Sequence, residues 1–241
     1  MSAPDPALVH ILTACLSPDA AARAPAEAAL QSTIAQAHGC TIQLLDVILA
    51  AATVPPQVRA LAATCLRNCV NKRWKKVQNN PISADEKTQA RLRCMSCLLL
   101  PDAAIFRVCI AAIAKMLRVD WACDEWPDLL PNAVALASSP DPAAARRGMQ
   151  ALHALVKELS SMSLHSEKQK FVAACPHIAA IAAPAWQQLL AQVPSSGDAA
   201  AAARTVAKVH KHSLVRCASL AAAGGQVYAF LQSCCQVTCD V

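Results

Sequence analysis

A cysteine pair and a histidine pair have residue types and spacings that could support chemistry. Cys94 and Cys97 form a Cys-x-x-Cys pair, a spacing that zinc sites and redox motifs use. No second Cys/His pair follows at finger spacing, and the pattern places both thiols inside one helix. His210 and His212 flank Lys211 without a third partner for a metal or for catalysis. We therefore expect packed or surface thiols, a solvated helix face for the histidines, and no metal site.

The motifs of common catalytic and nucleotide-binding sites are missing. The chain contains no G-x-S-x-G, no G-x-x-x-x-G-K-[ST] and no G-x-G-x-x-G. Five glycines in 241 residues leave little material for a loop that cradles a phosphate. We expect no catalytic residues and no cofactor, so the sequence predicts a binding protein and not an enzyme.

The composition is typical of helices packed on helices. Hydrophobic residues make up 55%, much of it alanine, and aromatic residues make up only 3%. Alanine favours helices, whereas strands favour β-branched and aromatic residues. The thirteen cysteines are an odd number, which together with the lack of a signal peptide predicts reduced, intracellular thiols.

Charge is distributed unevenly along the chain. Residues 1–58 carry a net charge of −3, residues 59–118 carry +9, and residues 119–241 carry 0. We call residues 59–118 the basic middle third. Such an excess of positive charge favours an acidic partner or surface.

One uncharged stretch, residues 171–197, is long enough to raise the question of a membrane span. It contains three prolines, a histidine and three glutamines, which are costly in lipid. We therefore expect no membrane insertion.

Apolar segments of helical length alternate with short breaks at Pro, Asp and Ser. The pattern predicts ten helices, at 5–16, 18–36, 40–53, 56–74, 83–100, 102–119, 126–138, 141–161, 166–193 and 199–223. Three of them open alike, at Asp19, Asp102 and Asp141, and aspartate at a helix start accepts hydrogen bonds from free backbone N–H groups.

Successive helix pairs recur about every 40 residues, which is the period of HEAT repeats. The predicted fold class is all-α, a right-handed HEAT-repeat superhelix (α-solenoid) of about five antiparallel helix pairs. A single pair cannot bury its apolar face alone and must stack on its neighbours. Residues 224–241 do not continue the pattern, and we expect an irregular tail there.

Four motifs, in order and at the right separations, resemble the N-terminal domain of the importin-beta (karyopherin-beta) superfamily. They are P-A-E-A-A-L at 25–30, the helix V-R-A-L-A-A to K-R-W at 58–74, I-S followed by E-K at 82–87, and the run from aspartate to W-P-D-L-L-P at 120–131. Residues 147–186 are similar to the importin-eleven branch. The resemblance divides the chain into importin-beta N-terminal-like HEAT repeats (1–137), further HEAT repeats (138–223) and the tail (224–241).

The resemblance implies a nuclear transport receptor that binds the GTPase Ran in its GTP form on the inner surface of the first repeats. Cargo proteins and nucleoporins would contact a longer array, in the nucleus, the cytoplasm and the nuclear envelope or pore. Family members are several times longer, so a fragment, a truncated gene model and a divergent short form all stay open. We expect a monomer.

The polar faces of the second helix of each pair supply the candidates for Ran contact. They are Glu27, Arg67, Asn71, Lys72, Arg107 and Lys115. Cations at a helix C-terminus also complement the helix dipole, which alone would explain Lys72.

The family-signature residues are expected to be structural. They are Trp74, Trp126, Pro127 and Leu130, and large side chains such as the two tryptophans can fill the space between neighbouring repeats.

A generic HEAT scaffold is the alternative function. It would bind an acidic protein or a nucleic acid through the basic middle third, although this region lacks interleaved aromatic residues for base stacking.

Overall fold

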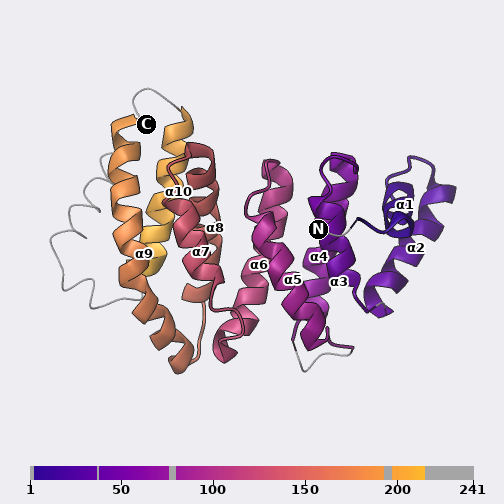
Figure 1. The fold of residues 1–241 in the computed structure, drawn as a ribbon, viewed down its shortest axis with the longest axis horizontal. Helices are drawn as coiled ribbons and strands as arrows, with labels where there is room; N and C mark the ends of the chain where they lie inside the picture. Colours follow the sequence, from indigo (N-terminus) through magenta and orange to yellow (C-terminus); the bar gives the residue numbers. More distant parts are fainter. Residues whose placement is uncertain (1–2, 37, 76–79, 193–196, 215–241) are drawn as a thin grey trace. The chain divides into compact units, whose positions relative to one another are not determined.

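The computed structural model describes residues 3–36, 38–75, 80–192 and 197–214. Within these residues, all regular structure is helical (Figure 1). The chain divides into two compact units, Met1–Trp126 (unit 1) and Pro127–Val241 (unit 2). The all-helical HEAT-type fold class is confirmed.

Unit 1 holds three helix pairs. They are α1 (Pro6–Ala14) with α2 (Ala20–Gln36), α3 (Cys40–Leu49) with α4 (Pro56–Arg73), and α5 (Ala84–Cys97) with α6 (Ala103–Asp120), followed by the 3-10 helix η1 (Trp121–Cys123). Within each pair the two helices pack together, and between pairs α3 packs on α5 and α4 on α6. In the second and third pairs, first helices therefore stack on first helices and second on second, as a repeat array requires, whereas α1 of the first pair packs on α4.

Unit 2 holds two pairs. They are α7 (Leu129–Ala137) with α8 (Pro142–Ser160), and α9 (His165–Gln192) with α10 (Gly197–Leu214). Here α8 also packs on α10 and α7 on α9. Gly148 lets α8 approach α7 closely, because a Cβ at this position would overlap the backbone of Leu136 and Ala137.

The aspartates at the three helix starts form helix caps, as the sequence predicts. Asp102 accepts hydrogen bonds from the backbone N–H groups of Ala104 and Ile105, at 2.9 and 3.0 Å. Asp19 caps α2 and Asp141 caps α8 in the same manner. Side-chain caps of this kind satisfy donors that have no partner inside the helix.

Three predicted helices, at 40–53, 83–100 and 126–138, are each four residues shorter in the structure, and the one predicted at 83–100 spans Ala84–Cys97. The helix expected at 40–53 ends at Leu49, and Val54 N–H bonds to Ala50 in a turn that leads into Pro55. The helix expected at 126–138 begins at Leu129, because a residue that precedes a proline, here Trp126, is disfavoured in the helical region. The expected tail, 224–241, lies outside the described residues.

None of the described helices is long and apolar enough to cross a membrane. The uncharged stretch at 171–197 falls largely within α9, where Pro176 and Pro184 occur inside the helix.

Candidate partner-binding face

The second helices of unit 1 each bury one side and expose the other. In α4, Ala62, Leu66 and Cys69 are fully buried, whereas Arg67 and Asn71 are exposed one turn apart. In α6 a buried apolar row faces the core. It consists of Ile105, Cys109, Ala112, Ile113 and Met116. This arrangement is the amphipathic pattern of a surface helix.

All six candidates for Ran contact are exposed, on helices that pack in the order α2, α4, α6. We call them the B-helix face: Glu27 of α2, Arg67, Asn71 and Lys72 of α4, and Arg107 and Lys115 of α6. The face is mainly basic. Its one acid, Glu27, lies 3.5 Å from Arg23 one turn earlier, and both side chains are largely exposed. These six residues stay predictions.

Trp74 is fully buried at the end of α4. Its Nε1–H donates to Oδ1 of Asp120 at 2.9 Å, and Nε of Arg91 donates to Oδ2 of the same carboxylate at 2.9 Å. Asp120 is itself 2% exposed. One buried carboxylate therefore ties α4, α5 and α6 together, and Trp74 is not available as a surface anchor.

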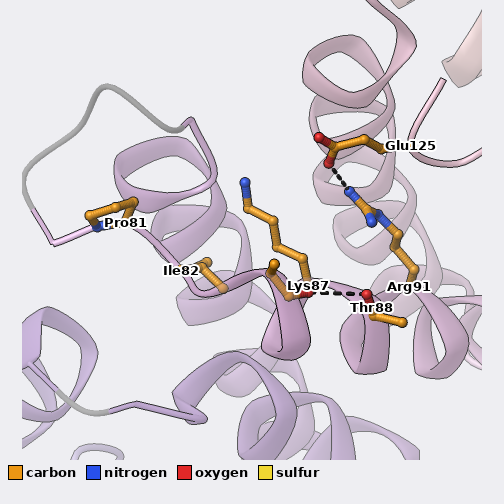
Figure 2. Close-up of a pocket in the computed structure, with 7 residues that line it drawn as sticks. Pro81, Ile82, Lys87, Thr88, Arg91 and Glu125 are labelled. Carbon is orange, nitrogen blue, oxygen red and sulfur yellow. Dashed lines mark hydrogen bonds and ion pairs between the residues drawn. The ribbon is translucent and has the colours of Figure 1, made fainter. Parts of the chain in front are cut away.

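Two cations surround the Trp74 ring. Nζ of Lys87 lies 5.3 Å from the ring centroid and Cζ of Arg91 lies 5.8 Å from it, both within the range of cation–π attraction. The second arm of Arg91 bonds Oε2 of Glu125 at 2.6 Å, as Figure 2 shows. We call Trp74, Lys87, Arg91, Asp120 and Glu125 the tryptophan hub.

A pocket of about 300 Å³ adjoins the hub (Figure 2). Its lining residues are Pro81, Ile82, Ala84, Lys87, Thr88, Arg91 and Glu125. The polar wall is largely the ion pair between Arg91 and Glu125, whose charges already compensate each other. We therefore interpret the pocket as a feature of the packing around α5 and not as a ligand site.

Other cations of the basic middle third also make internal contacts. Nε of Arg59 donates to the carbonyl of Ile48 at 2.7 Å, near the C-terminus of α3. Nη1 of Arg73 donates to the carbonyl of Ile34, at the C-terminus of α2, at 2.8 Å. Both arginines are buried. Helix C-termini leave carbonyls without intrahelical partners, which these guanidinium groups supply with donors.

Arg93 of α5 pairs with the buried Asp46 of α3, with an Nε–Oδ1 distance of 2.8 Å. Part of the +9 charge of the basic middle third is thus directed into the protein, which weakens the case for a nucleic-acid surface there. The sequence analysis did not identify these contacts, because each pair joins residues far apart in sequence.

Glu86 has a structural role that the sequence analysis also missed. Its two carboxylate oxygens accept hydrogen bonds from the backbone N–H groups of Gly39 and Thr41, at 2.8 and 3.0 Å. Gly39 has φ of 77°, so the chain enters α3 through a left-handed residue that suits glycine. Glu86 therefore caps α3 from α5.

The remaining signature residues differ in exposure. Trp126 and Leu130 are each 7% exposed, whereas Pro127 is exposed. Their structural role stays a prediction.

Cys94 and Cys97 are both buried in α5. The Sγ atom of Cys94 lies 3.8 Å from Sδ of Met116, and a hydrogen bond with Cys109 together with burial raises the pKa of the Cys97 thiol. A buried thiol with a raised pKa is a poor nucleophile. The part of the chain that the structure describes contains no group of three or more His, Cys, Asp or Glu side chains placed to hold a metal.

The expectation of a solvated helix face is wrong for His212. Its ring lies 5.9 Å from that of His153 of α8, between ring centroids, and its Nδ1 is 3.2 Å from Oγ of Ser160. The side chain of His210 lies outside the described residues.

The first repeats are similar to a domain of a known protein family. Residues 26–99 match the family model of the importin-beta N-terminal domain. Importin-11 of Homo sapiens is 27% identical over 198 residues, which cover 80% of this chain and 20% of that protein. The resemblance to the importin-beta superfamily and to its importin-eleven branch is therefore confirmed.

Solved structures share the fold. Lph2, a bidirectional nuclear transport receptor of S. cerevisiae, matches with a TM-score of 0.74 at 20% identity, over 86% of this chain and 20% of its own. Yeast importin-beta, Kap95p, matches with a TM-score of 0.70 at 16% identity, over 95% of this chain and 26% of its own. A further Kap95p structure, in which its binding induces the switch loops of RanGDP to adopt the GTP-bound conformation, has a TM-score of 0.63 at 16% identity, over 95% of this chain and 25% of that one. The chain spans about a fifth of the length of the curated relatives it matches.

Proposed function

We propose that this chain acts as the Ran-GTP-binding N-terminal portion of a nuclear transport receptor, because residues 26–99 match the family model of the importin-beta N-terminal domain. The observation that carries the proposal is this family match. Kap95p, a protein of the same fold, binds Ran in one of the matched structures, which supports the choice of partner.

The B-helix face is the proposed contact surface. It presents four cations and one amide from α4 and α6 and one acid from α2, all exposed. Binding energy at interfaces concentrates in a few residues, so we expect a subset of the six to dominate. Arg67 and Arg107 are the first choices, since arginine is enriched at such interfaces.

The tryptophan hub holds together the helices that carry this face. Trp74 ends α4 and Asp120 ends α6, so their hydrogen bond fixes the two helices that carry five of the six candidate residues. A preorganised surface loses less entropy on binding than a mobile one.

Nucleotide dependence is the direct test. The purified chain is mixed with Ran loaded with a non-hydrolysable GTP analogue or with GDP, and binding is measured by isothermal titration calorimetry. We expect binding to the GTP-analogue form and much weaker binding to the GDP form. Equal affinity for both forms, or no binding to either, would falsify the proposal.

A pair of matched double variants locates the surface. Arg67→Gln/Arg107→Gln removes two positive charges from the B-helix face, and Lys157→Gln/Lys208→Gln removes two exposed charges from unit 2. We expect the first variant to weaken binding of Ran by about tenfold or more, as for loss of interface arginines, and the second to leave it unchanged. The reverse pattern would place Ran elsewhere.

The wider role follows from the same proposal. The relatives include a bidirectional nuclear transport receptor. We propose that the chain acts as a monomer between nucleus and cytoplasm and at the nuclear pore, and that cargo and nucleoporins bind it as part of a longer receptor. Release of cargo would require Ran to bind one conformation of the receptor more tightly than another.

A further inference from the structure

The packing of α8 on α10 in unit 2 brings basic groups together. The rings of His153 and His212 lie 5.9 Å apart between centroids, tilted by 35°. Oγ of Ser160, at the end of α8, lies 3.2 Å from Nδ1 of His212. Two histidines from two helices therefore meet at one place in the fold.

Each histidine has a lysine one turn away on its own helix. Lys157 follows His153 by four residues on α8, and Lys208 precedes His212 by four residues on α10. Side chains four residues apart lie on the same side of a helix. Both lysines are exposed, while His153 is half-buried. We call these four residues the basic seam.

Acidic groups are scarce along the two helices. The sequence of α8 contains one acid, Glu158, beside Arg146, Arg147 and Lys157, and that of α10 contains one, Asp198, beside Arg204, Lys208 and Lys211. The helix α9, which packs on both, contains one acid, Glu167, beside Lys168, Lys170, His165 and His177. Burial first, then the neighbouring His212, Lys208 and Lys157, lowers the pKa of His153 to about 4. Like charges that face one another favour an external anion.

We propose that the basic seam, formed by His153, Lys157, Lys208 and His212, docks an acidic segment of a partner protein. Carboxylates fit the seam because each of its two helices offers an exposed lysine one turn away from a histidine. A nucleic acid fits it less well, because neither α8 nor α10 contains a Phe, Tyr or Trp on which a base could stack. The residues of the seam belong to unit 2 and those of the B-helix face to unit 1, and the proposal does not depend on Ran.

Docking of carboxylates is coupled to protonation of the seam. A carboxylate beside His153 stabilises the imidazolium form and so raises the pKa of that histidine. Binding then takes up a proton, and the affinity rises as pH falls. Fixed lysine charges alone would give no such dependence near neutral pH, because lysine stays protonated there.

Fluorescence anisotropy with a fluorescein-labelled peptide of ten glutamates tests the proposal on the full chain at low salt. We expect the exposed-residue variant Lys157→Gln/Lys208→Gln to weaken binding about three- to tenfold, as for loss of two exposed ion pairs. The control Lys75→Gln/Lys168→Gln removes the same charge outside both the basic seam and the B-helix face, and should leave binding unchanged. No binding by the wild-type chain, or equal losses in both variants, would overturn the proposal.

A second measurement tests the histidines. The wild-type chain should bind the peptide more tightly at pH 5.0 than at pH 7.5, because the pKa of free His153 is only about 4 and proton uptake on binding becomes large only near that range. The variant His153→Gln/His212→Gln should abolish this difference while keeping the lysine-dependent part. An unchanged pH difference in that variant would overturn the role of the histidines. Tighter, seam-dependent binding of a ten-nucleotide oligothymidine than of the peptide would overturn the assignment to an acidic protein.

Discussion

The two units use positive charge in opposite ways. In unit 1, half-buried arginines meet carboxylates: Arg91 bonds Asp120 and Glu125, and Arg93 bonds Asp46. In unit 2, His153 meets His212 with two lysines close by. Both units are built from stacked helix pairs, so the difference does not come from the fold.

A charge paired with an opposite charge stabilises the protein that contains it, whereas like charges placed together attract external anions. A buried ion pair that loses one partner becomes strongly destabilising. A buried histidine among cations stays neutral and opposes protonation instead. The comparison predicts that unit 1 is sensitive to loss of its carboxylates and that unit 2 is sensitive to acid.

Replacement of Asp120 should have the largest effect. Asp120→Ala removes the acceptor of both Trp74 and Arg91 in a buried setting, and we expect a loss of about 3–5 kcal/mol of unfolding free energy, as for other broken buried pairs. Urea denaturation followed by tryptophan fluorescence measures it. The matched control is Asp85→Asn, an exposed acid of the same unit. A loss below about 1 kcal/mol would contradict the role of the hub, because hydrogen bonds to charged groups alone contribute more than that.

Replacement of Glu86 measures how much one charged helix cap contributes to stability. Glu86→Gln keeps one acceptor for the N-terminus of α3 but loses the charge and the second acceptor for Gly39 and Thr41. We expect a loss of about 1.5–3 kcal/mol, the range for hydrogen bonds to charged groups. Faster amide hydrogen exchange in α3, measured by mass spectrometry, should accompany it. Unchanged exchange in α3 would contradict the capping role.

The fold was predictable from the sequence because its signals are local. Helix entries at Asp102 and Asp141 and the buried stripe of α6 are set by neighbours within four residues along the chain. The breaks at Pro55 and Pro127 were also visible, although the helix predicted at 40–53 extends four residues past Leu49 and the helix predicted at 126–138 begins three residues before Leu129. Helical period and helix caps predict that a segment is a helix more reliably than they predict where its last turn ends.

The internal contacts were not predictable in the same way. Asp120 lies 46 residues from Trp74 and 29 from Arg91, and no local pattern connects them. His212 was interpreted as part of a solvated helix face because its partner, His153, lies 59 positions earlier. Spacing within one helix reveals which side is apolar, whereas polar partners across helices depend on how the repeats stack. The B-helix face itself stays a prediction until it is tested with Ran.

Acid should destabilise unit 2 more than unit 1. The pKa of His153 is lowered to about 4, so the unfolded chain binds the proton first. The stabilising effect of neutral His153 is therefore complete above the unfolded pKa of about 6.5 and is lost progressively as pH falls toward 4. Since this side chain is only partly buried, we expect a loss of about 1 kcal/mol between pH 7 and 5.5 after allowance for solvent screening.

Hydrogen exchange with mass spectrometry resolves this effect by helix. After correction for the intrinsic exchange rate, amide hydrogens of α8 and α10 should be less protected from exchange at pH 5.5 than at pH 7. In the variant His153→Gln this difference in protection should be smaller. An equal fall in α4 and α6 would point to a general acid effect and against His153.

The smallest effect is expected at Glu27. Its contact with Arg23 spans one exposed turn of α2 at 3.5 Å, and such pairs contribute about 0.3–0.5 kcal/mol. Glu27→Gln should therefore change the urea midpoint of unit 1 very little, in contrast to Asp120→Ala. Because Glu27 also belongs to the B-helix face, the same variant separates the two roles of a surface charge. If the affinity for Ran changes while the urea midpoint does not, Glu27 acts in binding. A large shift of the midpoint would contradict the comparison, because it would mean that this exposed ion pair stabilises unit 1 as much as a buried ion pair does.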